Sequence, residues 1–227
     1  MIYIDSVSKR IKGKTIIDRL SLSLPEGKIT ALVGKNGCGK TTLIRLISGV
    51  LTPDSGRIYS DCSNTIGVLF GGEVSLYNKL TGLENIEYFA KLRGLTAEQF
   101  AARCDDLAEL LEFGGFMNQK TEGYSRGMKQ KIAFAIAVIH DPQVLLLDEP
   151  STGLDITTSI DVIKLINRSR NENKTVLIST HNIAEILHLS DRVAIMKNGN
   201  IKMCEDKATL FGEMNMESAL TKLAAVI

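Results

Sequence analysis

The chain has 227 residues, of which 44% are hydrophobic and 23% are charged, so it can bury one good core, with or without an attached subdomain. Its 27 Lys and Arg residues nearly balance its 26 Asp and Glu residues, and the net charge of +1 gives no electrostatic reason to expect nucleic acid as a partner. The four cysteines are far apart in sequence and form no CxxC pair, which argues against a disulfide framework and against a zinc site.

The N-terminal region contains two strand-like segments. Residues 1–5 (MIYID) and 16–24 (IIDRLSLSL) alternate polar and apolar side chains and are separated by the turn-prone KGK. Alternation of this kind is typical of antiparallel strands with one face in water. We therefore expect an antiparallel β side sheet near the N-terminus.

Four further segments are apolar on both faces, as strands are when helices cover a parallel sheet on each side. They are residues 28–34, 143–149, 175–180 and 192–199. Helical stretches lie between them, so the sequence predicts an α/β core with a mostly parallel sheet.

The clearest motif, GKNGCGKT, follows the first of these strands and precedes the helical stretch TTLIRLISGV. It matches G-x-x-x-x-G-K-[ST], a pattern in which backbone N–H groups and a helix N-terminus surround phosphate oxygens. Lys40 is expected to reach the β- and γ-phosphates of a nucleotide, and the Thr41 hydroxyl is expected to bind Mg²⁺. The residues predicted to contact the nucleotide are Gly34, Asn36, Gly37, Cys38, Gly39, Lys40, Thr41 and Thr42.

The pattern becomes helical between roughly residues 75 and 135. Two segments there, GLENIEYFAKLRGL and TAEQFAARCDDLAELLEF, place apolar residues three and four apart, and no strand candidate interrupts them. We expect a single domain with its core at roughly 1–74 and 136–227 and a helical subdomain inserted at roughly 75–135.

The segment EGYSRGMKQKIAFAIAV resembles the start of a second anion-binding helix. Ser125 is the expected N-cap of a helix that runs to Ile139, with the free N–H groups of Arg126, Gly127 and Met128 facing outward. Alternatively Ser125 only caps the helix and the basic residues are solvated. From this stretch alone, the capping interpretation is favoured.

Acidic residues and a histidine follow two of the apolar strands. Asp148 and Glu149 end the segment VLLLDE, and His181 directly follows TVLIST. Because ligands of α/β sheets bind at the carboxyl ends of the strands, all three side chains are expected in one crevice. We expect Asp148 to hold Mg²⁺, Glu149 to accept a proton from the attacking water, and His181 to contact the γ-phosphate.

Together these motifs resemble the nucleotide-binding subunit of ABC transporters, over essentially the whole chain and in that family's order. The resemblance rests on GKNGCGKTT, on YSRGMKQ as the signature sequence, and on LLLDEPSTGLD followed by STH. It implies a P-loop NTPase core, an ATPase that uses ATP and Mg²⁺ with Lys40, Glu149 and His181 as catalytic residues, and a head-to-tail dimer. In such a dimer Ser125 and Gly127 would contact the ATP of the second copy, with Asp155 of the D-loop at the same interface.

The segments IGVLFGGEVSLYNKLTGLENIEYFAKLRGL and YSRGMKQKIAFA are most similar to the ABC-2 exporter branch typified by sodium-efflux (NatA-type) ATPases. This implies a cytoplasmic exporter subunit, held on the inner face of the membrane by a separate transmembrane permease. The alternative is a soluble ABC-type ATPase acting on a non-transport partner. Phe70, Leu76 and Tyr77 are candidates for receiving a permease helix, or else pack internally.

Three positions depart from the family pattern. Ile11 stands where an aromatic residue usually stacks on adenine, and Tyr3 is in the wrong register to replace it, so we expect weak discrimination of ATP from GTP. Glu73 lies where the family usually has a glutamine; it either reaches the metal or lytic water or is an exposed loop acid. Arg126 replaces the first signature glycine and either adds charge near the partner's γ-phosphate or points to solvent.

Overall fold

The computed structural model describes residues 1–60, 65–71, 76–212 and 214–226. Its main sheet has six strands in the order β5-β6-β7-β3-β8-β9. These are β3 (Ile29–Val33), β5 (Ile66–Leu69), β6 (Val144–Asp148), β7 (Thr175–Ser179), β8 (Arg192–Lys197) and β9 (Asn200–Asp206). The first five pair in parallel, and β9 pairs antiparallel with β8. The prediction of an α/β fold with a mostly parallel sheet is confirmed.

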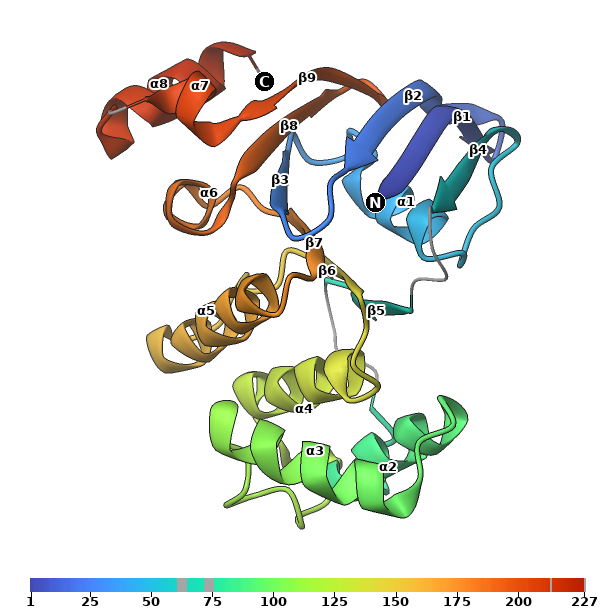
Figure 1. Ribbon diagram of the computed structural model, residues 1–227, viewed down its shortest axis with the longest axis vertical. Helices are drawn as coiled ribbons and strands as arrows, with labels where there is room; N and C mark the ends of the chain where they lie inside the picture. The colour runs from blue at the N-terminus through green and yellow to red at the C-terminus, as the bar shows by residue number, and fades with distance from the viewer. Residues whose placement is uncertain (61–64, 72–75, 213, 227) are drawn as a thin grey trace.

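A separate three-stranded sheet has the order β2-β1-β4 and is antiparallel throughout. It consists of β1 (Ile2–Ile11), β2 (Lys14–Leu24) and β4 (Ser55–Ser60). In Figure 1 it lies at the upper right, beside helix α1 (Lys40–Ile47). The predicted antiparallel side sheet is therefore confirmed, with β4 as a strand that the hydrophobic pattern did not indicate.

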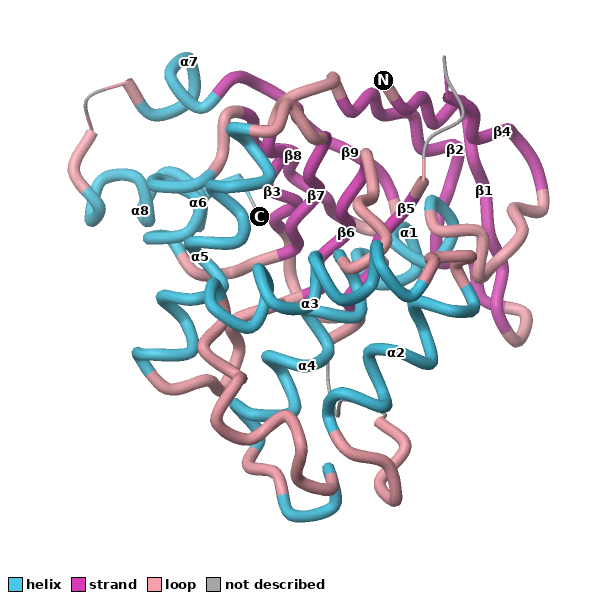
Figure 2. Tube along the Cα trace, turned by 60° about the horizontal axis from the view of Figure 1, so that its bottom comes forward, coloured by secondary structure: helices cyan, strands magenta, loops and turns pink. Residues whose placement is uncertain are grey.

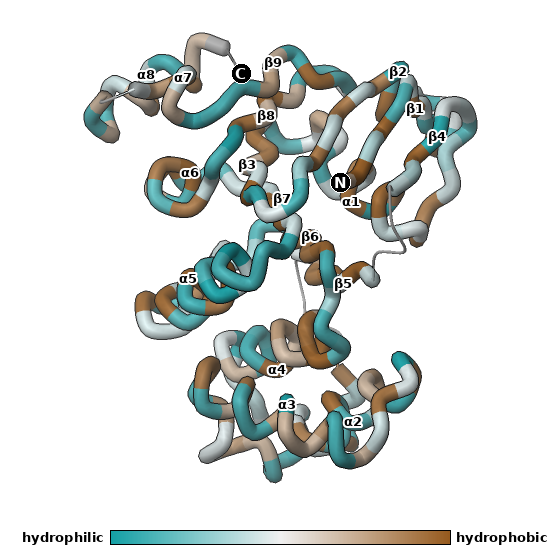
Figure 3. The backbone as a smooth tube through the Cα atoms, in the orientation of Figure 1, coloured by the Kyte–Doolittle hydropathy of each residue, from teal (hydrophilic) through white to brown (hydrophobic). Residues whose placement is uncertain are grey.

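Each face of the main sheet packs into its own hydrophobic cluster, because successive side chains of a strand point to opposite faces. On one face Ala31, Leu147 and Ile178 pack with residues of the long helices. On the other face Leu32 and Leu146 pack with α1 and the side sheet. The strands are thus buried on both sides, as their apolar sequences predicted. Figure 3 shows hydrophobic and hydrophilic residues interspersed along the helices, as expected for helices that are apolar on one face.

Apart from α1, the helices fall into three groups in space (Figure 1). Helices α5 (Ile156–Asn171) and α6 (Ile183–Leu189) flank the main sheet, and α7 (Lys207–Phe211) and α8 (Met216–Val226) follow β9. Helices α2 (Gly82–Leu92), α3 (Ala97–Leu110) and α4 (Arg126–Val138), with the 3₁₀ helix η1 (Thr121–Gly123), lie together at the bottom of Figure 1 and the front of Figure 2. Within the described ranges, no helix combines the length and apolar character needed to cross a bilayer.

Local sequence explains where these helices begin. Thr81 and Thr96 accept hydrogen bonds from the backbone N–H of Glu84 and Gln99, whose side chains bond back to the threonine N–H groups. Such capping boxes satisfy backbone donors that a helix start leaves free. The expected boundary of the helical insert at residue 135 falls inside α4, and the division into core and insert stays a prediction.

Candidate active site

The predicted phosphate-binding loop connects β3 to α1, and two of its glycines are required by close packing. A Cβ at Gly34 would lie 2.3 Å from the carbonyl oxygen of Met196 on β8. Gly39 has a φ of +113°, and a Cβ there would lie 2.8 Å from Cε of Met196. Only glycine lets the loop lie this close to β8 in this conformation. The loop is thus held by the sheet beneath it.

Lys40, the first residue of α1, is only 6% exposed. Its Nζ donates a hydrogen bond of 2.8 Å to the carbonyl oxygen of Gly34, at the opposite end of the loop. The ammonium group is therefore held across the curve of the loop. A positive charge in this position, next to backbone N–H groups, suits phosphate oxygens.

Three polar side chains meet at the carboxyl ends of β6 and β7. The Thr41 hydroxyl donates to Asp148 Oδ2 at 2.6 Å, and the Ser179 hydroxyl donates to Asp148 Oδ1 at 2.5 Å. Asp148 and Ser179 are register partners on adjacent parallel strands, which explains their contact. A hydroxyl and a carboxylate beside a phosphate loop are the oxygen ligands that Mg²⁺ prefers, so Thr41 and Asp148 fit the predicted metal.

Glu149 follows β6 and has a φ of +46°, a left-handed conformation that is uncommon for a residue with a side chain. Its backbone N–H donates to the Ser179 carbonyl at 3.0 Å and to the Ser179 hydroxyl at 3.1 Å. These bonds hold the strained backbone. The side chain is 28% exposed, and its Oε1 lies 3.7 Å from Nδ1 of His181, beyond hydrogen-bond distance.

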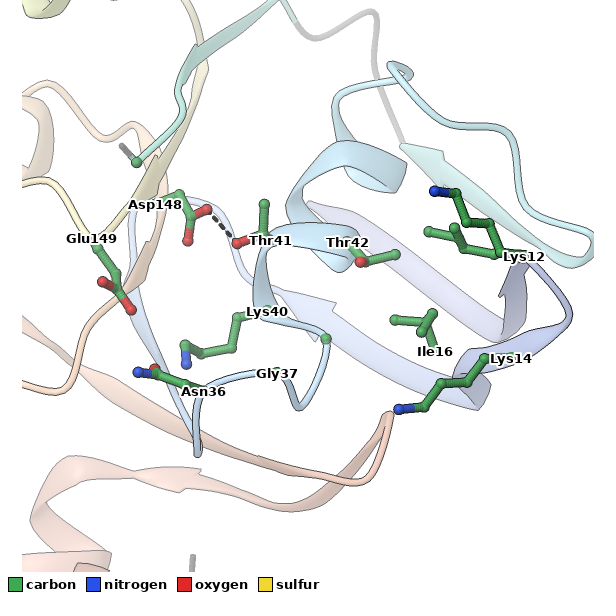
Figure 4. A pocket seen from close by; sticks show the side chains of 13 residues that line it. Lys12, Lys14, Ile16, Asn36, Gly37, Lys40, Thr41, Thr42, Asp148 and Glu149 are labelled. Carbon is green, nitrogen blue, oxygen red and sulfur yellow. Dashed lines mark hydrogen bonds between the residues drawn. The ribbon is translucent and has the colours of Figure 1, made fainter. Parts of the chain in front are cut away.

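One cavity of about 710 Å³ contains most of these groups. Figure 4 shows Asn36, Lys40, Asp148 and Glu149 on one side of it, and Lys12, Lys14 and Ile16 on the other. Its lining residues are Ile11, Lys12, Lys14, Ile16, Asn36, Gly37, Gly39, Lys40, Thr41, Thr42, Gly71, Asp148 and Glu149. The cavity is large enough for a nucleotide, with its anion-binding groups at the end formed by β3 and β6.

Ser125 caps helix α4, as its sequence position predicted. Its hydroxyl oxygen accepts a 3.2 Å hydrogen bond from the N–H of Met128. The expectation that the Met128 N–H is free is therefore wrong, because the capping side chain already occupies it. Helix α4 ends at Val138, one residue before the expected end.

Arg126 takes an arrangement that the two expected alternatives did not include. Its Nη2 donates a 2.7 Å hydrogen bond to the carbonyl oxygen of Thr152, in the D-loop (residues 151–155) of the same chain. A Cβ on Gly153 would lie 2.5 Å from Nη1 of Arg126, so the guanidinium group lies directly on the D-loop. The start of α4 and the D-loop are thus joined within one chain.

Asp155 ends the D-loop and caps helix α5. It accepts hydrogen bonds from the Thr157 hydroxyl at 2.6 Å and from the N–H and hydroxyl of Thr158 at 2.8 and 3.0 Å. These donors, the Thr157 hydroxyl first, lower the pKa of Asp155 to about 2, because they stabilise the ionised carboxylate. A Cβ on Gly127 would lie 3.2 Å from Asp155 Oδ2, so the signature and the D-loop are adjacent.

The structure brings some of the predicted residues together and leaves others apart. Ser125, Gly127 and Asp155 do not line the cavity, and His181 faces a neighbouring hollow beside Asn36. Gly34 and Cys38 do not line the cavity; a Cβ on Gly34 would lie 2.7 Å from Sγ of Cys38, so the two residues are neighbours within the loop. Glu73 lies outside the described residues.

Sequence reasoning missed several residues at this site. Ser179 binds both Asp148 and the Glu149 backbone, yet the only signal for it is a hydroxyl at the end of a buried strand. Lys12 and Lys14 belong to the KGK segment, which indicated only a turn. Their presence in the cavity depends on how the side sheet packs beside α1, which local sequence does not encode.

Comparisons with known proteins agree with this geometry. The family model described as ABC transporter matches residues 17–152. The ABC transporter ATP-binding protein NatA of Bacillus subtilis is 39% identical over 215 residues, covering 88% of this chain and 87% of NatA. The spermidine/putrescine import ATP-binding protein PotA of Nitrosospira multiformis is 32% identical over 220 residues, covering 93% of this chain and 61% of PotA.

Solved structures share the architecture. An ATP-binding subunit of an ABC transporter matches with a TM-score of 0.89 at 22% identity, covering 99% of both chains. The dimeric post-hydrolysis structure of the ATP-binding cassette MJ0796, bound to ADP and Pi, matches with a TM-score of 0.79 at 26% identity, covering 91% of this chain and 98% of that one.

Proposed function

This chain belongs to the ABC transporter family as an ATP-binding subunit with ATPase activity, and we propose that it powers an exporter of the sodium-efflux type. The higher identity to NatA than to the importer subunit PotA supports this direction of transport. The exporter-like segments around the signature, YSRGMKQKIAFA, support it as well.

The observation that carries the catalytic assignment is the convergence of Lys40, Thr41, Asp148 and Glu149 in one cavity. Lys40 binds the β- and γ-phosphates of ATP. Thr41 and Asp148 would hold Mg²⁺, which when bound offsets the negative charge of the phosphates. Glu149 accepts the proton of the attacking water, and His181 contacts the γ-phosphate.

We further propose that two copies close on ATP. Ser125, Gly127 and Asp155 are adjacent to each other but lie outside the cavity of their own chain, where they can serve a second copy. The partner's γ-phosphate would then meet the start of helix α4, whose N-terminal N–H groups favour an anion. Because this contact exists only while ATP is bound, hydrolysis would open the dimer.

A separate membrane permease is the second proposed partner, and it would hold the subunit at the membrane. Of the three candidate docking residues, Leu76 packs against the main core and Phe70 lies half-buried beneath Arg45. Tyr77 is 49% exposed and contacts the ring of Tyr88 on α2 edge to face. Tyr77 is therefore the candidate available to a permease helix. We propose no nucleic acid partner.

Replacing Glu149 by Gln tests the mechanism. The amide keeps the shape of the side chain but cannot take a proton, so we expect ATP turnover to fall by about 10² to 10⁴ while ATP binding persists. The variant should accumulate as a dimer with ATP on size-exclusion chromatography. Glu109→Gln, an exposed acid on α3, is the control and should behave as wild type. A Glu149→Gln protein that stays monomeric and fully active would contradict both the proposed role of Glu149 as the base and the proposed ATP-dependent dimer.

The transport assignment needs a different measurement. Tagged protein isolated from gently solubilised membranes should carry a transmembrane protein, and Tyr77→Asp should reduce its recovery, because a charge opposes burial in an apolar contact. Isolation of the subunit with a non-membrane partner instead would favour the alternative function.

A further inference from the structure

We propose that Glu185 is a positioning residue for ATP hydrolysis, which holds the two loops bearing Glu149 and His181 in register. The proposal rests on the catalytic roles proposed above for those two residues. Glu185 lies on helix α6 and does not line the nucleotide cavity. It therefore acts through the residues it binds rather than on the substrate.

The Glu185 carboxylate is buried, with 7% of the residue exposed, and each of its oxygens accepts a hydrogen bond from a different loop. Oε2 accepts from the Thr180 hydroxyl at 2.6 Å. Oε1 accepts from the Ser151 hydroxyl. A buried carboxylate is costly unless it is hydrogen-bonded, so these two contacts fix where the side chain can lie.

The first contact controls the backbone around His181. Thr180 immediately precedes His181, and its hydroxyl oxygen also accepts a 3.0 Å hydrogen bond from the N–H of Asn182. The residues on both sides of His181 are thus tied to one hydroxyl group, which Glu185 orients. Asn182 in turn caps α6 by accepting from the Ala184 N–H at 3.0 Å.

The second contact controls the turn that follows Glu149. The N–H of Thr152 donates to the Glu149 carbonyl at 3.2 Å, and the N–H of Leu154 donates to the Ser151 carbonyl at 3.2 Å. Ser151 lies inside this tight turn, so its hydroxyl bond to Glu185 sets the position of the whole turn relative to α6. Ser179 holds the strained backbone of Glu149, at a φ of +46°, on its N–H side, and the bond between Ser151 and Glu185 fixes the turn on the other side.

The rest of the buried face of α6 is apolar, through Ile183, Ile186 and Leu189. An apolar residue at 185 would satisfy packing there, but it would leave the buried hydroxyl of Thr180 and the half-buried hydroxyl of Ser151 without this acceptor. A carboxylate, with two oxygens, can accept from both loops at once. A glutamate at position 185 is therefore better explained by its bonds to both loops than by packing in the core.

The test is steady-state kinetics of Glu185→Ala in the full chain. The substitution removes the hydrogen bonds that hold the loops of Glu149 and His181 but leaves the phosphate loop unchanged. We therefore expect kcat to fall roughly 10- to 100-fold. KM and the affinity for ATP should stay within about twofold. Glu185→Gln, which can accept from one hydroxyl and donate to the other, should restore most of the activity.

A matched control separates positioning from general destabilisation. Asp161 on α5 is also buried, at 3% exposure, but it pairs with Lys131 and Lys164 and touches neither loop. Asp161→Asn should lower the Tm and leave the kcat of the folded protein unchanged. If Glu185→Ala lowers the Tm in the same way without changing kcat, the positioning role is refuted.

Two further variants separate this proposal from the one it rests on. If Glu149→Gln and His181→Ala lose activity but Glu185→Ala does not, only the role of Glu185 fails. If Glu149→Gln or His181→Ala retains full activity, the proposed catalytic assignment itself fails. Should Glu185→Ala not fold, Thr180→Val removes one of the two hydroxyl contacts with little change in volume. Its kcat should still fall with an unchanged KM, and wild-type kinetics would overturn the proposal.

Discussion

Individual side chains at one end of the cavity determine how well it can distinguish one nucleotide base from another. At the end opposite Glu149, the described lining residues are Ile11, Lys12, Lys14 and Ile16, none of which carries an aromatic ring. Tyr3 cannot replace the missing ring, because it stacks on Tyr59 with the ring centroids 5.1 Å apart, within the side sheet. Aliphatic contacts and ammonium groups offer little that distinguishes adenine from guanine.

We therefore predict that ATP and GTP bind with similar affinity, and that Ile11→Tyr strengthens ATP binding. A ring stacked on the base contributes about 1 kcal/mol beyond its area, which is roughly a fivefold change in Kd. Titration with a fluorescent nucleotide analogue, displaced by ATP or GTP, measures both effects, and Ile11→Leu serves as the aliphatic control. A strong preference of the unmodified protein for ATP would contradict the interpretation.

The convergence of Lys40, Asp148 and Glu149 in one cavity was predictable, because each belongs to a contiguous motif beside a buried strand. Lys40, Asp148 and Glu149 needed only that local context. The contacts of Arg126 with Thr152 and of Glu185 with Ser151 were not predictable, because the partners are distant in sequence. They are brought near only by the packing of helices on the sheet.

At the level of elements, strands were missed where their own sequence carries no clear hydrophobic pattern. The four apolar segments became β3, β6, β7 and β8, since burial on both faces leaves a clear sequence pattern. Strand β4 is mostly exposed and reads SGRIYS, and β5 has only four residues, so neither carries such a pattern. The antiparallel pairing of β9 with β8 likewise depends on a partner strand rather than on its own sequence.

The contact between helix α4 and the D-loop yields a second prediction. Arg126→Ala removes the 2.7 Å bond to the Thr152 carbonyl, so the D-loop should open more often. Losing one such bond corresponds to roughly three- to tenfold faster hydrogen exchange of amides 152–155, measured by mass spectrometry. Lys129→Ala, which removes another basic side chain of the same helix, should leave these amides unchanged. Equal exchange in both variants would show that Arg126 does not restrain the loop.

Across the whole molecule, the helical group and the main sheet meet at the end of α4, where His140 is half-buried. Its Nε2 lies 3.2 Å from the Ile66 carbonyl on β5. Burial lowers the pKa of His140 most, and the charges of Arg93 and Arg103 lower it further, whereas the bond to the Ile66 carbonyl and the charge of Asp141 oppose the shift. The folded protein thus favours the neutral ring more than the unfolded chain does.

This shift predicts how the stability of the fold depends on pH. Above the unfolded-state pKa, about 6.5, the stabilisation is fully present, and it is lost as the pH falls toward the lower folded-state pKa. Between pH 7 and pH 5 the Tm should therefore drop, and His140→Gln should reduce that drop by about a few degrees. Differential scanning fluorimetry across this range, with the exposed His181→Gln as control, measures the difference. An unchanged slope in His140→Gln would contradict the assignment.

The left-handed backbone of Glu149 also has a consequence for directed evolution. Glycine would adopt this conformation without strain, so stability at position 149 favours a residue that has no carboxylate at all. Given the role proposed for Glu149 as the base, we expect a laboratory selection for heat resistance alone to collect folded, ATP-binding variants at this position that no longer hydrolyse ATP. Any such selection needs a simultaneous requirement for nucleotide turnover.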